Sequence, residues 1–180
     1  MILDFEALKA IDNWSWLVYF VSLSVLFYIF WRKKTISSSL IAVLITTVIT
    51  FFMNEYRDFL LTEIADKSNV EQHKTLIRYA WYYGFTAFNV VLIIAIYKSH
   101  VTLKLAYSYT TRYILTSHFA MSLLQITRCL ERQSFHTDYL ALLYQWGIVV
   151  INLSCTIIVL FMALVALHKT RHFEMTRGVL

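Results

Sequence analysis

The chain has 180 residues, of which 59% are hydrophobic, 17% aromatic and only 15% charged. A soluble domain has about 45–50% apolar and about 25% charged residues, so this chain has too little polar surface for an aqueous fold. Its three scattered glycines form no phosphate-binding loop, which excludes an ATP- or GTP-driven pump that carries its own motor. We therefore predict an all-α, polytopic integral membrane protein with one helical domain over residues 1–180.

Four stretches are apolar enough to cross a hydrocarbon core of about 30 Å, which takes about 20 helical residues. They cover residues 14–31, 36–53, 79–97 and 139–167. The last stretch is longer than one crossing requires, so we expect it to tilt or to project into water. The connection 54–78 is too short for a separate domain. We expect it to extend the second helix by several turns or to lie on the membrane.

A fifth stretch, 105–127, is less apolar, and the distribution of charge decides how it is interpreted. With five spans and an outer N-terminus, the inner segments hold nine basic residues against one acid, Glu174. The outer segments then hold ten acids and seven bases. Enrichment of Lys and Arg on the cytoplasmic side is the expected bias. We predict five transmembrane helices, with the N-terminus outside and the C-terminus in the cytoplasm, and four spans as the alternative.

Polar side chains in and beside the stretch 105–127 follow one helical face. They are Ser108, Thr111, Arg112, His118, Ser122 and Gln125. Polar and ionisable groups at membrane depth usually face the protein interior or a water-filled cavity. Two interpretations remain open: hydrogen bonds that hold helices together, or a hydrated or ligand-contacting path. His118 is the most informative residue because it lies near mid-span.

Other predicted spans offer polar partners for this face. They are Thr46, Thr47 and Thr50 in the second span, Thr86 and Asn89 in the third, and Gln145, Asn152 and Thr156 in the fifth. None of the spans contains an Asp or Glu, which argues against a carboxylate-based proton or sodium transporter. We expect a partly polar bundle interior.

Basic residues would gather at the inner rim of such a bundle. They are Arg32, Lys33, Lys34, Lys98, Lys104, Lys169 and Arg171. Each basic residue near an anionic leaflet contributes about 1 kcal/mol, so contact with lipid headgroups is one interpretation. Docking of an acidic soluble partner is the other.

No motif in the chain is specific enough to name a family or a reaction. The cysteines Cys129 and Cys155 form no Cys-x-x-Cys pair, and no Gly-x-Ser turn is present. We predict no catalytic residue, no metal and no cofactor, and we favour membrane orientation over nucleic-acid binding as the reason for the positive charge.

The leading hypothesis is a non-enzymatic membrane subunit that oligomerises, or that anchors or senses for a partner at its basic cytoplasmic face. One alternative is a small oligomeric channel lined by the polar face of the fourth span. Another is an effector or immunity-type protein of a bacterial defence or toxin system. The compact size and short loops favour a bacterial inner membrane, and the many aromatic residues favour a homo-oligomer.

Overall fold

The computed structural model describes residues 5–65, 67–135 and 137–177, and side chains within 14–62, 75–135 and 137–171. Over these ranges the chain forms α-helices and one π-helical turn, without a strand. The elements are α1 (Phe5–Lys33), α2 (Ser38–Ala65), α3 (Lys67–Leu103), α4 (Tyr109–Leu130), the π-helix η1 (Glu131–Phe135) and α5 (Ala141–Arg177). The prediction of an all-α fold is confirmed.

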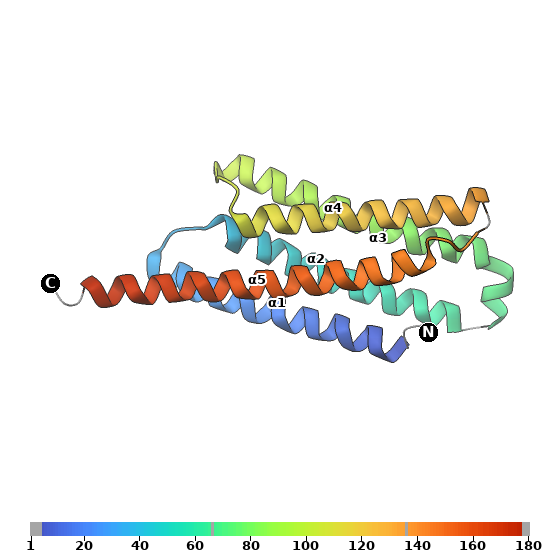
Figure 1. Cartoon of the computed structure of the whole chain (residues 1–180), viewed down its shortest axis with the longest axis horizontal. Helices are drawn as coiled ribbons and strands as arrows, with labels where there is room; N and C mark the ends of the chain where they lie inside the picture. The colour runs from blue at the N-terminus through green and yellow to red at the C-terminus, as the bar shows by residue number, and fades with distance from the viewer. Residues whose placement is uncertain (1–4, 66, 136, 178–180) are drawn as a thin grey trace.

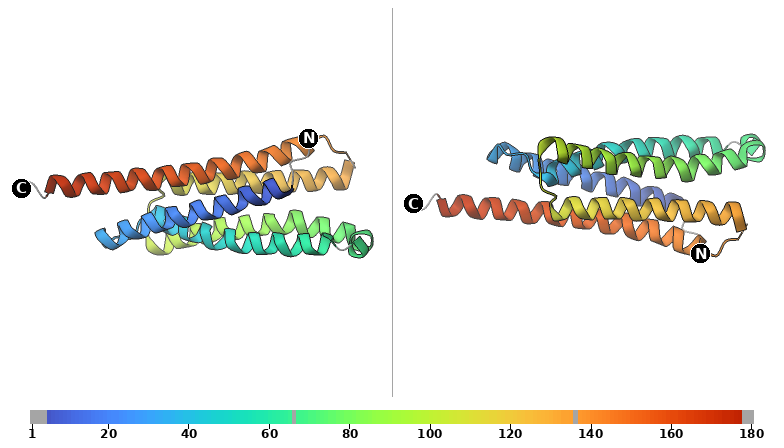
Figure 2. Two further views of the ribbon diagram at one scale, coloured as in Figure 1. Left: turned by 90° about the horizontal axis from the view of Figure 1, so that it is seen from below. Right: turned by 90° about the horizontal axis from the view of Figure 1, so that it is seen from above.

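The five α-helices form an elongated up-and-down bundle (Figure 1). Each helix packs against the one before it, and α5 returns to lie beside α1, so the helices close into a ring. Two further views show the same side-by-side arrangement of the helices (Figure 2). Short connections between long antiparallel helices favour this topology.

Within the described residues, four helices contain segments long and apolar enough to cross a membrane: Trp14–Lys33, Ser38–Thr62, Thr75–Leu103 and Ala141–Arg171. The chain therefore has the features of an integral membrane protein. Each segment includes most or all of one predicted span. The helices exceed the predicted spans: α2 continues to Ala65, and α3 begins only two residues later, at Lys67. The expected extension of the second helix by several turns is thus observed, and α3 covers the rest of the connection 54–78 from Lys67 onward.

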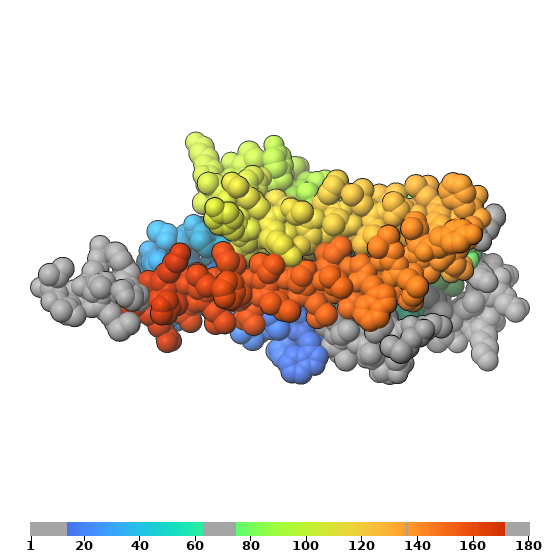
Figure 3. Space-filling model, viewed as in Figure 1, coloured from blue at the N-terminus to red at the C-terminus, as the bar shows by residue number. Residues whose placement is uncertain are grey.

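The helix α5 has 37 residues and continues past the other helices toward the C-terminus (Figures 1 and 2). The sequence predicted that this segment tilts or projects into water, and in the bundle α5 extends beyond the other helices. In the space-filling view, α5 runs along one side of the bundle beside α4, so much of its length remains uncovered (Figure 3).

Lysines occupy left-handed backbone positions in two of the turns. Lys34 follows α1 with φ 54°, and Lys104 follows α3 with φ 51°. After α3, the Leu105 N–H donates to the His100 carbonyl at 3.0 Å and the Lys104 N–H to the Val101 carbonyl at 3.3 Å. This is a Schellman motif, which usually places glycine where Lys104 stands. Local hydrogen bonds therefore end α3 sharply without a glycine.

Apolar side chains from all five helices form the core. The most deeply buried include Val43, Leu92, Ile96, Ile114 and Val159. Large apolar side chains also cover the outside, such as Phe27, Phe119 and Phe161, which are all more than half exposed. An apolar exterior of this extent fits a lipid environment.

Candidate functional site

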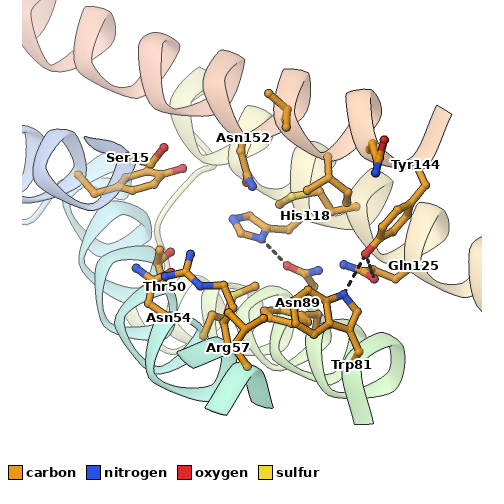
Figure 4. A pocket seen from close by; sticks show the side chains of 18 residues that line it. Ser15, Thr50, Asn54, Arg57, Trp81, Asn89, His118, Gln125, Tyr144 and Asn152 are labelled. Atoms are coloured by element: carbon orange, nitrogen blue, oxygen red, sulfur yellow. Dashed lines mark hydrogen bonds between the residues drawn. The ribbon is translucent and has the colours of Figure 1, made fainter. Parts of the chain in front are cut away.

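A cavity of about 220 Å³ lies inside the bundle, and all five α-helices contribute to its wall (Figure 4). Its polar lining residues are Ser15, Tyr19, Thr50, Asn54, Arg57, Trp81, Asn89, His118, Gln125, Tyr144, Gln145 and Asn152. Apolar side chains complete the wall, among them Met53, Leu61, Phe85, Met121, Ile148 and Val149. A mostly apolar wall with a few converging polar groups is typical of small-molecule sites.

His118 lies on the cavity-facing side of α4, where only 4% of the residue is exposed. Its Nδ1 lies 2.7 Å from Oδ1 of Asn89 on α3. An amide oxygen can only accept, so Nδ1 donates to Asn89, and in the neutral form of the ring the lone pair lies on Nε2. Nε2 is buried and has no hydrogen-bond partner among the described residues. The buried histidine thus has one ring nitrogen with a hydrogen-bond partner and one without a partner among the described residues.

A second polar group of the cavity centres on Tyr144 of α5. Its hydroxyl donates to Oε1 of Gln125 on α4 at 2.8 Å and accepts from Nε1 of Trp81 on α3 at 3.3 Å. Three helices are thereby joined at one point. The hydroxyl donates one hydrogen bond and accepts one, so these residues fix the shape of this part of the wall.

Arg57 on α2 brings a guanidinium group to the wall and is only 8% exposed. Its Nε and Nη2 atoms donate to Oδ1 of Asp58 at 3.1 and 3.0 Å. The neighbouring carboxylate therefore compensates the charge. An arginine that is paired in this way does not require an anionic ligand.

A separate hydrogen-bond cluster joins three helices near the start of α4. The hydroxyl of Ser38 lies 2.8 Å from Nε2 of His100 and 2.7 Å from the hydroxyl of Thr111. Ser38 also accepts from the backbone N–H of Ser108 at 2.9 Å. His100 is completed by its own helix, with Nδ1 2.8 Å from the Ile96 carbonyl. Both ring nitrogens are satisfied, so this cluster ties helices together.

The predicted polar face of the fourth span therefore separates into different roles. His118 and Gln125 line the cavity, whereas Ser108 and Thr111 belong to the cluster around His100. Ser122 bonds to the carbonyl of His118 on its own helix at 3.0 Å. Arg112 is exposed and does not share the buried face.

Among the expected polar partners, Thr50, Asn89, Gln145 and Asn152 line the cavity, but the sequence reasoning missed Arg57 and Trp81. For Arg57 a signal was present. Thr50, Asn54 and Arg57 follow one another at helical spacing, which continues the polar stripe of the second span past its predicted end at residue 53.

The seven predicted docking residues lie at one end of the bundle and are exposed. They occupy the last turns of α1 and α3, the turns that follow these helices, and the distal part of α5. This is the end from which α5 projects (Figure 1). Among residues whose side chains are described, every acid lies toward the opposite end: Glu55, Asp58, Glu131 and Asp138.

An ion-pair cluster closes the opposite end. Arg128 donates to carboxylate oxygens of Glu131 and Asp138, and Arg132 also reaches Asp138 at 2.7 Å. The backbone N–H of Leu140 donates to Glu131 at 2.8 Å, which fixes the turn before α5.

The carboxyl groups of this cluster have lowered pKa values. Burial raises the pKa of Glu131, but hydrogen bonds from Leu140 and Arg128 outweigh this and hold it below its ordinary value. The guanidinium of Arg128 holds the pKa of Asp138 below its ordinary value as well.

The fold and its apolar exterior define the class of protein: an all-helical protein with four helices suited to crossing a membrane and a partly polar interior. No protein-family model matches the chain, and neither a curated protein nor a solved structure matches it.

Proposed function

We propose that this chain is a non-enzymatic integral membrane subunit that holds an acidic soluble partner at its basic end. The observation that carries the proposal is the separation of charge along the bundle. Basic residues from three helices and two turns gather where α5 projects, and no acid whose side chain is described lies among them; Glu174 follows further along α5. Such a surface attracts and orients an acidic partner, as well as anionic lipid headgroups.

The proposal includes five membrane crossings, with the N-terminus outside and the C-terminus in the cytoplasm of a bacterial inner membrane. The packing of α4 supports the fifth crossing. Its 22 residues reach about 33 Å, and it lies between α3 and α5 in the ring. Its polar residues mostly face inward, whereas Phe119, Leu123 and Leu130 are exposed. A low average hydropathy is therefore compatible with an apolar outer face.

The channel alternative receives less support from the packing. It requires the polar face of α4 to line a lumen between copies of the chain. Thr111, His118, Ser122 and Gln125 are instead buried against other helices of the same chain. This arrangement favours polar groups that face the interior of their own chain over a lumen shared between copies.

The test compares two variants of the four residues Lys33, Lys34, Lys169 and Arg171. One variant replaces all four with Gln, and the matched control exchanges Lys for Arg and Arg for Lys, so that the charge is kept. We expect native mass spectrometry of the gently solubilised complex to show a second polypeptide with the wild type and the control, but not with the Gln variant. Retention of the partner by the Gln variant would contradict docking at this end.

A reporter fused after Leu180 tests the orientation independently, and we expect it to report a cytoplasmic location. An outer location would support the four-span alternative. If only anionic lipid is lost from the Gln variant and no second polypeptide is found with any of the three proteins, the basic end serves lipid contact alone.

A further inference from the structure

Two buried polar atoms of the cavity wall have no hydrogen-bond partner among the described residues. They are Nε2 of His118 and Oγ of Ser15, in residues that are only 4% and 6% exposed. A buried polar atom without a partner costs about 1–3 kcal/mol. Both residues line the same cavity, on α4 and α1 (Figure 4). The cavity is therefore incomplete until something inside it supplies hydrogen bonds.

The chemistry of His118 specifies one of those bonds. Since Asn89 Oδ1 accepts from Nδ1–H, Nε2 is left as an acceptor, and its partner has to be a donor. Ser15 can donate or accept, so it can pair with a second polar group or with a water molecule. A hydroxyl-bearing molecule meets the requirement at His118.

The rest of the wall specifies the body of that molecule. Phe85, Met121, Ile148 and Val149 present apolar surface to the cavity. The charge of Arg57 is compensated by Asp58, and Tyr144 is engaged by Gln125 and Trp81. The wall thus favours an uncharged molecule whose remaining surface is apolar.

Water alone is a poor occupant for such a space. At about 220 Å³ the cavity is many times the roughly 15 Å³ that one water molecule needs, so it has room for a small organic molecule. A buried water needs two to four polar partners, which waters beside the polar lining residues would find but waters against Phe85, Met121, Ile148 and Val149 would not.

We propose that the cavity is a binding site for a small, uncharged, largely apolar molecule with a hydroxyl group that donates to Nε2 of His118. This site is distinct from the basic end, and its existence does not depend on the proposed docking function. The helix α5 contributes Gln145, Ile148, Val149 and Asn152 to the wall of this cavity.

The experiment uses the full chain in lipid nanodiscs with ¹⁵N-labelled histidine, and 4-ethylphenol as the probe. The matched control ligand is 4-ethylanisole, which has the same apolar body and no hydroxyl donor. We expect 4-ethylphenol to shift the Nε2 signal of His118 saturably and 4-ethylanisole to leave it unchanged. A His118→Leu variant assigns that signal by its loss.

Two neighbouring residues of α5 give matched protein variants. Val149 lines the cavity and is 7% exposed, whereas Val150 is 58% exposed on the outside. Val149→Phe fills part of the cavity without touching the His118–Asn89 bond and should weaken 4-ethylphenol binding by about tenfold or more. Val150→Phe should leave binding unchanged.

Either of two results would overturn the proposal. Equal, non-saturable shifts with both compounds would mean that they only partition into the lipid. The absence of any shift of the His118 signal with 4-ethylphenol would mean that the cavity does not bind a hydroxyl-bearing molecule of this kind at His118. The comparison of the two compounds on the wild type stands even if a substitution prevents folding.

Discussion

Replacement of Gly84 by alanine tests the packing of α2 against α3 most directly. A Cβ at this position would lie 2.5 Å from Cε1 and 2.6 Å from Cζ of Tyr56. The ring of Tyr56 has little freedom to move, because its hydroxyl donates to the Ala80 carbonyl at 2.7 Å. It also packs against Phe85 and Phe88, with centroid distances of 5.7 and 5.4 Å. Glycine is therefore required here for close approach of the two helices.

The magnitude follows from three contributions. Overpacking costs about 1–3 kcal/mol, and loss of the Tyr56 hydrogen bond costs about 1 kcal/mol more. Alanine gains up to about 1 kcal/mol over glycine in a helix. We expect Gly84→Ala to lower the free energy of unfolding by about 1–3 kcal/mol, measured by SDS-induced unfolding in mixed micelles.

Gly147 on α5 provides the matched control. A Cβ there would meet Cδ1 of Leu124 at 2.8 Å, but this is the far end of a flexible side chain that can rotate away. Gly147→Ala should be neutral or stabilising by up to about 1 kcal/mol. In a Tyr56→Ala background, Gly84→Ala should also become neutral or stabilising. Equal effects of the two glycine substitutions in the wild-type background would refute the steric argument.

Three further predictions concern the ends of the bundle. Lys104→Gly should raise the unfolding free energy by about 1 kcal/mol, because glycine adopts positive φ without strain, whereas Lys104→Val should lower it; the same micelle assay decides the sign. His100→Ala should lower the free energy of unfolding by about 1–3 kcal/mol, because it leaves the buried hydroxyl of Ser38 with fewer hydrogen-bond partners. A loss of unfolding free energy smaller than the loss caused by an alanine substitution at an exposed position would contradict this prediction. The carboxyl pKa values of Glu131 and Asp138 are lower in the folded chain than in the unfolded chain, so their contribution to stability is present above about pH 4 and is lost as the pH falls below it. Thermal unfolding between pH 7 and pH 3 should show less acid sensitivity in a Glu131→Gln/Asp138→Asn variant than in the wild type.

The positions of the helices could be predicted because hydrophobic length and charge bias are properties of the sequence alone. The fourth segment is informative, because its polar residues lower the average hydropathy although several of them face inward. The predicted start at residue 105 was early, since Ser108 accepts from the Thr111 N–H and caps α4 before Tyr109. Such a cap depends on a side-chain hydrogen bond that hydropathy does not report.

The lining of the cavity was predictable only in part, because it depends on which faces of the helices pack against one another. His118, Asn89 and Gln125 stood out as polar groups at membrane depth. Arg57 and Trp81 did not, since charged and aromatic residues near helix ends are ordinarily assigned to the interface. Arg112 was grouped with the polar face because it follows Thr111, yet a shift of one residue turns a helical side chain by about 100° and leaves it exposed.

The helix α5 contributes residues both to the cavity and to the basic end. Val149 lines the cavity, and Lys169 lies 20 residues further along the same helix, about 30 Å away, at the basic end. If occupancy of the cavity changes the position of α5, it changes affinity for a partner at the basic end, and linkage requires the partner to change affinity for the occupant by the same factor. Partner affinity should then differ with and without 4-ethylphenol, and Val149→Phe, which fills the cavity, should abolish that difference. Equal partner affinity under both conditions would make the cavity and the basic end independent sites on one rigid helix.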